Sequence, residues 1–239
     1  MGELDLRVPL GNDVCVPWFD QEVGSSFTEI FLDQEYSGLF RFMKPPVRWV
    51  DLGAFAGFFS AWVLWTRNRM KMRGPSPEAL LIDADENSVP LVASLIRVNN
   101  LSEVFHFRHG AIADGTGTCK FVRRGYMSSG LASIASDSGQ LLNVPILTGA
   151  EIMASLPPPY DLVKVDIEGA EYELLRNQRD FLSQCEYLLM EWHSWHSGGG
   201  GLTQLQELAV AARFSQVAEL QPAREVPAGQ TGIILFRRI

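Results

Sequence analysis

The chain has 239 residues, 46% of them hydrophobic, and carries a formal net charge of −8. Its length and composition are typical of a single α/β domain with a large core. The acidic balance argues against nucleic acid as a partner, because binding to a phosphate backbone depends on clustered Lys and Arg. The longest apolar stretch near the first glycine-containing turn, residues 55–65, is interrupted by Ser60 and is too short to span a bilayer.

The cysteines and the first residues indicate a reducing compartment. Cys15, Cys119 and Cys185 are odd in number, widely spaced and without the spacing of metal ligands. Residues 1–10 contain three charged residues and lack the apolar segment of a signal peptide. We therefore expect a cytoplasmic protein whose partner is a small molecule, and not a nucleic acid or a membrane. The sequence leaves the oligomeric state open.

Apolar segments and turns alternate along the chain in an order typical of a doubly wound α/β sheet. A helix is expected at 25–43, within a lead-in segment of residues 1–45. The last strand follows the turn-rich residues 226–230 with no room for a crossover helix, so it should be antiparallel. The expected strands of the single domain, residues 1–239, are 47–52, 79–83, 104–110, 161–166, 186–191, 214–219 and 231–238.

A glycine-containing turn follows the first of these strands. Asp51 stands where the strand ends, and Gly53 and Gly57 precede a helix expected from Ser60 to Met70. Two small residues let the backbone pass close to a ligand at a helix N-terminus. The spacing is Gly-x-x-x-Gly and not the G-x-G-x-x-G of dinucleotide-binding turns. Asp51 suits the ammonium group of a ligand better than a pyrophosphate.

The second strand also ends in an acid. Asp83 lies 26 residues beyond Gly57, near the ~20-residue offset at which an acid typically binds ribose hydroxyls. A carboxylate at this place can accept hydrogen bonds from both hydroxyls. Asp85 is placed to cap a helix at 87–98. Asp83 is therefore the better candidate for a ribose contact, and Asp85 is the better candidate for the cap.

Residues 113–147 are too long and too polar for a simple connection. Long loops in compact domains are usually functional or disordered, and we expect a small β-rich insertion that covers the substrate site. Its Arg123 and Arg124 are candidates for contact with an anionic substrate group, with solvent exposure as the alternative. Residues 197–201, with four consecutive glycines, are expected to form a hinge or a linker.

Carboxylates are densest after the fourth expected strand, in the string Lys164-Val-Asp166-Ile-Glu168-Gly169-Ala-Glu171-Tyr-Glu173. Ligands of parallel α/β sheets bind at the carboxyl ends of the strands. Asp166 stands at such an end, before the next helix starts, and we expect a functional role for it. Glu171 and Glu173 lie in the first turn of that helix, where negative charge favours the macrodipole, so a structural role is the simpler interpretation.

Glu191 and His193 belong to the next strand, where they point to one face while Trp192 points to the other. In the usual strand order Asp166 and Glu191 end neighbouring strands. Two such carboxylates can hold a divalent cation, or one can act as a base beside His193. Magnesium or manganese suits oxygen ligands, and a histidine favours a transition metal. Structural roles are expected for the other histidines, His106, His109 and His196.

Together these elements resemble the FkbM family of S-adenosylmethionine-dependent methyltransferases. The resemblance rests on the glycine-containing turn at 50–60, on 144–147, on the carboxylate string at 161–171 and on 188–193, and it reaches a lead-in at 31–36. Roughly residues 27–195 are covered. The chain departs from the family at Ile82-Asp83-Ala84-Asp85, where the family usually has a Glu-Pro pair, although Asp83 offers the same hydrogen bonding.

The resemblance implies a class I, Rossmann-like methyltransferase fold and methyl transfer to a hydroxyl oxygen of a small-molecule or sugar-like acceptor. Two alternatives stay open. An NAD-dependent oxidoreductase should have the tighter glycine spacing, and a non-catalytic binding module would not need convergent carboxylates. The expected catalytic residues are Asp166, Glu168, Glu191 and His193, with Asp166 and Glu191 as the hypothetical metal ligands. The expected cofactor contacts are Tyr36, Asp51, Gly53, Ala54, Gly57, Phe58, Asp83, Ala84 and Ala111.

Overall fold

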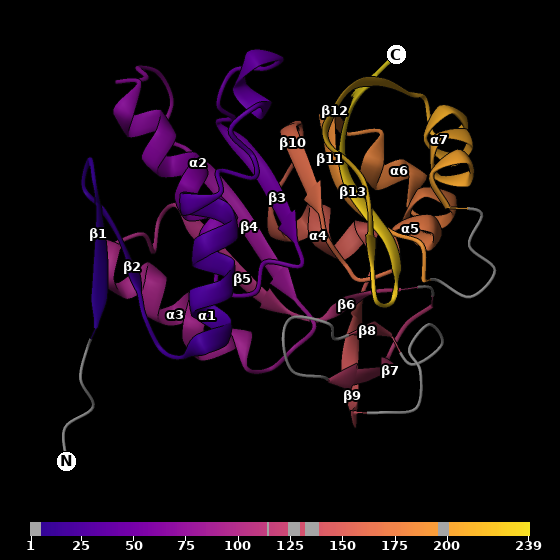
Figure 1. Ribbon diagram of the computed structural model, residues 1–239, viewed down its shortest axis with the longest axis horizontal. Helices are drawn as coiled ribbons and strands as arrows, with labels where there is room; N and C mark the ends of the chain where they lie inside the picture. Colours follow the sequence, from indigo (N-terminus) through magenta and orange to yellow (C-terminus); the bar gives the residue numbers. More distant parts are fainter. Residues whose placement is uncertain (1–5, 114, 124–129, 132–138, 196–200) are drawn as a thin grey trace.

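The computed structural model describes residues 6–113, 115–123, 130–131, 139–195 and 201–239. Its centre is a seven-stranded sheet with helices on both faces (Figure 1). From one edge to the other, the strands are β12 (Phe214–Val226), β13 (Gly229–Arg238), β11 (Cys185–His193), β10 (Tyr160–Val165), β3 (Arg48–Leu52), β4 (Glu78–Asp83) and β5 (Phe105–His109).

The direction of the strands confirms the expected doubly wound sheet. Strands β11, β10, β3, β4 and β5 run parallel, and β13 is antiparallel to both β11 and β12. The connection from β12 to β13 is a tight turn, which can join only antiparallel strands. Val165 pairs with Leu52 of β3 and with Met190 of β11. Asp166 and Glu191 therefore end neighbouring strands, as predicted.

Two cores lie on opposite faces of the sheet because successive strand residues alternate between the faces. Trp49 and Leu189 face one core, whereas Val50 and Leu188 face the other. The first core contains α1 (Gln21–Phe27), α2 (Phe58–Arg69) and α3 (Ser88–Asn99). The second contains α4 (Gly149–Ser155), α5 (Glu171–Asn177), α6 (Arg179–Leu182) and α7 (Gly201–Ala211). None of the described helices is both long and apolar enough to cross a membrane.

The lead-in differs from the helix expected at 25–43. It starts with a hairpin of β1 (Arg7–Gly11) and β2 (Val14–Pro17), which the sequence pattern does not predict. α1 begins at Gln21 because Asp20 caps it, accepting a hydrogen bond from Val23 N at 3.0 Å. The chain continues as a π-helical turn, η1 (Thr28–Leu32), and a 3₁₀ turn, η2 (Leu39–Arg41). Gln34, whose φ is +56°, prevents one continuous helix.

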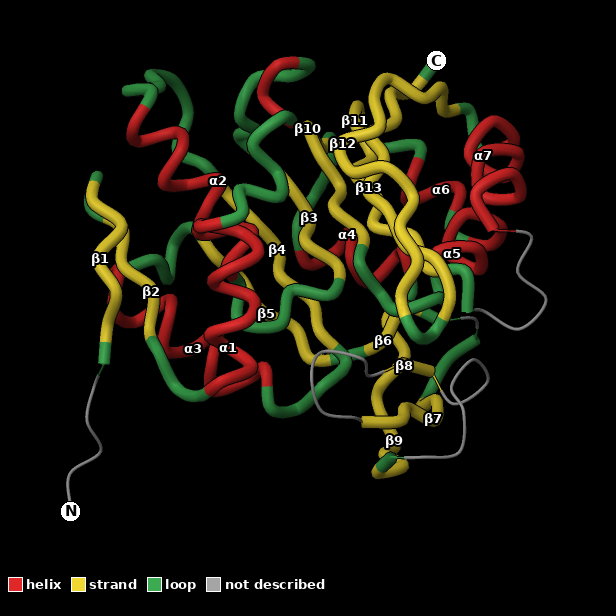
Figure 2. The backbone as a smooth tube through the Cα atoms, in the orientation of Figure 1, coloured by secondary structure: helices red, strands yellow, loops and turns green. Residues whose placement is uncertain are grey.

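The insertion after β5 is β-rich, as expected. Its strands are β6 (Ala111–Ile112), β7 (Thr118–Arg123), β8 (Gly130–Leu131) and β9 (Gln140–Leu147), in the order β6-β9-β7-β8. This small sheet lies beside the carboxyl ends of the parallel strands (Figure 2). Several sequence-based expectations fall outside the described residues. They concern Arg124, His196, the glycines at 198–200 and much of the polar stretch at 124–138.

Candidate active site

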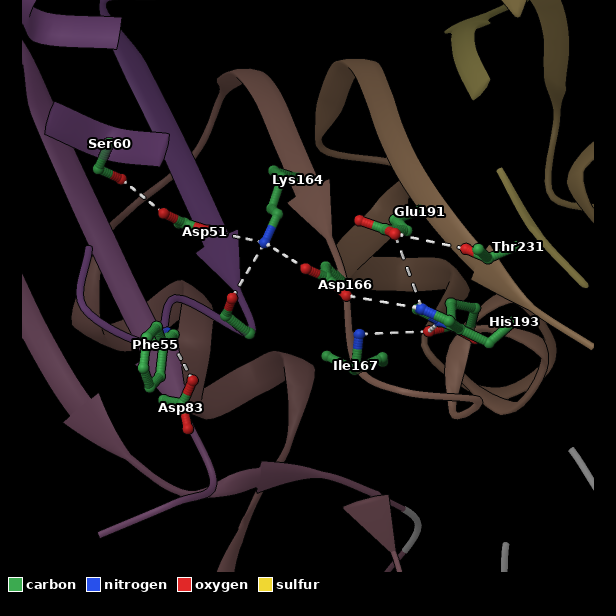
Figure 3. Close-up of polar contacts among 12 residues, drawn as sticks. Asp51, Phe55, Ser60, Asp83, Lys164, Asp166, Ile167, Glu191, His193 and Thr231 are labelled. Carbon is green, nitrogen blue, oxygen red and sulfur yellow. Dashed lines mark hydrogen bonds and ion pairs between the residues drawn. The ribbon is translucent and has the colours of Figure 1, made fainter. Parts of the chain in front are cut away.

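A buried ammonium group connects two strands of the sheet at their carboxyl ends. Nζ of Lys164 lies 2.9 Å from the carbonyl oxygen of Gly53, 3.2 Å from Asp166 Oδ2 and 3.6 Å from Asp51 Oδ1 (Figure 3). Burial by itself would lower the pKa of Lys164, but the carboxylates of Asp166 and Asp51 raise it above its ordinary value. Lys164 therefore stays charged and fixes Asp166 against the glycine-containing turn.

Asp51 faces the core rather than the open edge of the sheet. It is fully buried, accepts a hydrogen bond from Ser60 Oγ at 2.8 Å and is the register partner of Lys164. Burial raises the pKa of Asp51, whereas Lys164 and Ser60 lower it. The ammonium group beside Asp51 is thus that of Lys164, because the register of β3 and β10 places the two side chains together. A contact of Asp51 with a ligand stays a prediction.

The glycines of the turn are required by the packing of the protein itself. Gly53 and Gly57 both have a φ of +76°, in the left-handed region that favours glycine. A Cβ atom on Gly53 would collide with the carbonyl oxygen of Asp166, and one on Gly57 would lie 2.8 Å from Leu95 Cδ2. At both positions the close approach is made by the protein's own atoms, from the loop after β10 at Gly53 and from Leu95 of α3 at Gly57, and a ligand contact of the two glycines stays a prediction. α2 starts at Phe58, two residues earlier than expected.

Asp83 lies half-buried at the end of β4 and holds two loops together. Its Oδ2 accepts a hydrogen bond from Phe55 N at 2.6 Å, and its Oδ1 accepts one from Asp85 N at 2.8 Å. Burial raises the pKa of Asp83, and these two backbone hydrogen bonds lower it. Each carboxylate oxygen can accept more than one hydrogen bond. Asp83 is thus still able to bind a ligand hydroxyl.

Asp85 does not have the capping role expected from the sequence. The N-cap of α3 is Asn87, which makes no side-chain hydrogen bond to the helix. Asp85 Oδ1 instead accepts a hydrogen bond from Asn87 N at 2.9 Å and lies 3.3 Å from Arg123 Nε. Arg123 also pairs with Glu86 at 2.6 Å. This arginine, a candidate for an anionic substrate group, therefore joins the small sheet to the loop that follows Asp83.

His193 is 3% exposed, and its two ring nitrogens have different surroundings. Nδ1 lies 3.0 Å from Glu171 Oε1. Nε2 faces Asp166 Oδ1 at 4.0 Å and Glu191 Oε1 at 3.9 Å (Figure 3). Burial lowers the pKa of His193, but Glu171 and Glu168 together raise it to about 10. The imidazole is therefore protonated at neutral pH in the ligand-free protein.

Glu171 is a site residue that the sequence interpretation missed. It does begin α5, as expected, but its side chain is fully buried. Oε1 accepts hydrogen bonds from Ile167 N at 3.2 Å and Gly169 N at 3.1 Å, in addition to its contact with His193. A first-turn glutamate is usually explained by the helix dipole. Only the folding of the loop at 167–169 reveals that this one orients a histidine.

Two further carboxylates complete the cluster around His193. Glu168 has a φ of +54°, and burial raises its pKa to about 8. Burial and the neighbouring Asp166 raise the pKa of Glu191, whose Oε1 accepts a hydrogen bond from Thr231 Oγ1 at 3.3 Å. Ligand atoms of Asp166, Glu168 and His193 lie within 4.8 Å of one another. This trio differs from the predicted metal pair, Asp166 and Glu191, since Glu191 lies outside it.

The other expected residues are buried or, in the case of Ala84, half-buried beside the same edge of the sheet. Tyr36 packs edge-on against Phe59, and Ala54 and Phe58 belong to the core next to the glycine-containing turn. Ala84 and Ala111 pack together with Phe121 and Val144 of the small sheet. A cofactor contact of these five residues stays a prediction. His106 Nε2 lies 3.3 Å from Glu78, and His109 Nε2 lies 3.0 Å from the carbonyl oxygen of Ala84, which agrees with structural roles.

Several solved structures share this fold. An O-methyltransferase from Bacillus cereus in complex with SAH matches with a TM-score of 0.53 and 12% identity over 87% of this chain and 81% of that one. A putative O-methyltransferase from Klebsiella pneumoniae matches with a TM-score of 0.50 and 12% identity over 87% and 80% of the two chains. An uncharacterized protein from Listeria monocytogenes serotype 4b gives a TM-score of 0.51 and 12% identity, and the match covers 87% of this chain and 66% of that protein.

At this level of identity the similarity establishes the fold, which is the expected class I, Rossmann-like methyltransferase fold. No curated protein sequence matches the chain. Residues 51–220 match the family model of the methyltransferase FkbM domain. The match starts at Asp51 and includes Asp83, the Lys164–Glu171 string and the Glu191–His193 strand end. Because it covers most of the sequence, the chain belongs to the FkbM family of methyltransferases.

Proposed function

We propose that this methyltransferase moves the methyl group of S-adenosylmethionine to a hydroxyl oxygen of a small-molecule or sugar-like acceptor. The proposal rests mainly on the convergence of Asp166, Glu191 and His193 at neighbouring strand ends, at the same edge of the sheet as Asp83. The O-methyltransferase from Bacillus cereus has the same fold and was solved with SAH, the demethylated cofactor. This supports both the cofactor and the oxygen acceptor.

The residues at this edge fit S-adenosylmethionine. The cofactor carries a sulfonium and an ammonium group, and the edge is rich in carboxylates that favour cations. Asp83 has acceptor capacity left for ribose hydroxyls after binding Phe55 N and Asp85 N. When bound, the cofactor supplies a methyl carbon that is already electrophilic. The enzyme then has to align the acceptor and take up its proton.

Glu191 is the group that we assign to proton uptake. It lies on the strand next to Asp166, and its side chain is 14% exposed, so that an acceptor can reach it. In the transfer a carbon–oxygen bond forms, the carbon–sulfur bond breaks with its electron pair staying on sulfur, and the hydroxyl proton passes to the Glu191 carboxylate. A general base of this kind typically contributes about 10² to 10⁴ in rate. Lys164 and Glu171 keep Asp166 and His193 in position.

The small sheet is proposed to cover the acceptor. Arg123 ties it to Asp85 and Glu86 in the loop that follows Asp83, which supports a position next to the cofactor. A small-molecule acceptor in the cytoplasm remains the proposed partner and location. The proposed location rests on the odd number and wide spacing of the three cysteines in the sequence.

Calorimetric titration with S-adenosylmethionine and with its demethylated product tests the function. The wild-type chain should bind both, and Asp83→Asn should weaken binding about tenfold or more, because a charge-assisted hydrogen bond contributes about 1.5 to 3 kcal/mol. Asparagine keeps the size of the side chain and one acceptor for the backbone. Asp180→Asn, at the opposite end of the sheet, is the matched control. Binding of NAD in place of S-adenosylmethionine, or equal affinity in Asp83→Asn, would contradict the proposal.

A further inference from the structure

We propose that His193, Asp166 and Glu168 bind one divalent transition-metal ion, and that Glu171 orients His193 for this purpose. The proposal deepens the proposed function, on which it depends only for the role of the ion in the reaction. It replaces the pair of acids predicted from the sequence by a set of one nitrogen and two oxygen ligands. Glu191 lies beside this set and stays available for the acceptor proton.

The geometry of His193 is that of a metal ligand. The side chain is almost completely buried, with an exposure of 3%. Nδ1 is directed at the Glu171 carboxylate at 3.0 Å, whereas Nε2 has no hydrogen-bond partner within the described part of the chain. Histidines that bind metals almost always donate the proton of the other ring nitrogen to a carboxylate or carbonyl. Glu171 has this role here, and it directs the second nitrogen to the space between Asp166 and Glu191.

Glu168 offers the second ligand atom. Its φ of +54° is rare for a residue with a side chain, and such conformations cluster at ligand clamps and active sites. The described residues offer its carboxylate no hydrogen bond and no ion pair, although its ligand oxygen lies within 4.8 Å of those of Asp166 and His193. A carboxylate that makes no hydrogen bond or ion pair with the described residues and lies beside Asp166 and His193 is available to bind a cation.

Asp166 offers the third ligand atom. Lys164 occupies Oδ2 at 3.2 Å, so Oδ1 is left to face His193 Nε2 at 4.0 Å. This separation is too long for a hydrogen bond, but two atoms that bind the same ion from different sides are separated by about this much when each lies about 2 Å from it. Asp166, Glu168 and Glu191 repel one another when they are ionised, and a cation bound among them relieves this repulsion.

The ligand types select the kind of ion. One imidazole nitrogen with two carboxylate oxygens suits manganese, iron, cobalt or zinc better than magnesium or calcium, which prefer oxygen alone. A three-residue set leaves coordination positions for the acceptor. An ion here would hold the acceptor hydroxyl in line with the methyl group and lower the pKa of that hydroxyl.

Electron paramagnetic resonance tests the site. The full chain is treated with a chelator and titrated with Mn²⁺, and the signal of unbound Mn²⁺ gives the amount that is bound. The wild-type chain should bind one ion, and the bound ion should show nitrogen hyperfine coupling from His193. Glu168→Gln, His193→Gln and Glu171→Gln should each weaken binding by about 10- to 100-fold. Glu173→Gln, a carboxylate on the same helix turn as Glu171 but outside the cluster, is the matched control and should leave the affinity unchanged.

Two results would overturn the metal site. One is a wild-type chain that binds neither Mn²⁺ nor Zn²⁺ at millimolar concentration. The other is the same Mn²⁺ affinity in Glu168→Gln and His193→Gln as in the wild type, with the fold intact by circular dichroism. Calorimetry with S-adenosylhomocysteine separates this proposal from the function: cofactor binding without Mn²⁺ binding rejects only the metal site. Mn²⁺ binding without cofactor binding rejects only the proposed function.

Discussion

Lys164 organises the site at the scale of a single residue. Its ammonium group touches the carbonyl oxygen of Gly53 and lies near the carboxylates of Asp51 and Asp166. Asp51 lies at the end of β3, Gly53 lies in the turn after β3, and Asp166 lies in the loop after β10. A buried cation among buried acids contributes little net energy while all partners are present, but removal of one partner leaves the others uncompensated.

We therefore expect Lys164→Met to lower the free energy of unfolding by about 3 to 5 kcal/mol, because Asp51 is left as an unpaired buried charge. Urea denaturation measures the effect. The double variant Lys164→Met with Asp51→Asn should be less destabilised than the sum of the two single variants, since it removes both charges. Additive losses would show that the two side chains do not depend on each other.

A second residue-scale prediction concerns Glu171. Glu171→Gln keeps the shape of the side chain but removes the negative charge that orients His193 through Nδ1. We expect kcat to fall by about 10- to 100-fold, while the affinity for S-adenosylmethionine stays unchanged. Steady-state methyl transfer and calorimetry measure the two quantities. Glu173→Gln should leave both unaffected, and an equal loss of activity in the two variants would refute the orienting role.

A third prediction concerns Glu35, a half-buried residue of the lead-in. Burial, followed by the negative charges of Asp166 and Glu29, raises its pKa to about 7, although Lys164 and Arg224 lower it. The folded pKa exceeds the ordinary value of 4.5, so the folded protein binds this proton more tightly than the unfolded chain. The stability that Glu35 contributes is therefore present below pH 4.5 and is lost as the pH rises through about 7.

The variant Glu35→Gln should remove this loss. Glutamine keeps an acceptor oxygen for the side chain of Gln221, whose Nε2 donates a hydrogen bond to Glu35 Oε1 at 3.1 Å. As the pH rises from 4.5 to about 7, the variant should become more stable than the wild type by a growing difference in the free energy of unfolding. Urea denaturation at several pH values measures it, with the exposed Glu103→Gln as control. A difference that does not change with pH would contradict the prediction.

At the scale of the elements, the glycine-containing turn packs directly on the loop after β10. The ends of β3 and β10 lie so close together that only a residue without a Cβ atom fits at position 53. The left-handed φ of Gly53 is a second, independent requirement. The two effects can be separated because Gly11 has almost the same φ, +78°, but a Cβ atom there would meet no described atom within 4 Å.

We expect Gly11→Ala to cost about 1 to 2 kcal/mol, which is the penalty of the left-handed conformation alone. Gly53→Ala should cost at least about 4 kcal/mol, because the Cβ atom also displaces the carbonyl oxygen of Asp166. Thermal and urea unfolding of the two variants measure the difference. Equal destabilisation would mean that the loop after β10 moves away without strain.

At the scale of the whole molecule, the small sheet is attached to the main sheet by charge and by a small apolar cluster. Arg123 is the only basic side chain of β7 for which the described residues provide carboxylate partners, in Asp85 and Glu86. The apolar cluster contains Ala111, Phe121 and Val144. Because Asp85 N donates a hydrogen bond to Asp83 Oδ1, we expect the attachment of the small sheet to affect the proposed ribose contact.

The variant Arg123→Glu should weaken S-adenosylmethionine binding by about two- to fivefold, the range expected for ion pairs that are partly exposed. Combination with Glu86→Arg restores opposite charges and should recover most of the affinity. Calorimetric titration of the single and double variants provides the measurement. A double variant that binds S-adenosylmethionine as weakly as Arg123→Glu would indicate that Arg123 supports cofactor binding independently of Glu86.

The sequence by itself determined the family, the order of the strands along the chain and the antiparallel direction of β13. These follow from local information: apolar runs that end in Asp51, Asp83 and Asp166, and a turn too short for a crossover. Neighbouring strand ends also placed Asp166 beside Glu191. The lead-in was the weakest expectation, since a hairpin and a π-helical turn have no strong local signature.

Only the tertiary structure decided which partners these residues have. Lys164 meets the carbonyl oxygen of Gly53 across 111 residues of sequence, and His193 meets Glu171 across 22. Such contacts depend on the register of parallel strands and on the path of loops, which no local pattern encodes. The same geometry gives Gly53 and Gly57 close packing contacts and makes a first-turn glutamate the partner of a histidine. Local hydrophobic periodicity determines the fold, whereas the distances between strand ends determine the chemistry of the site.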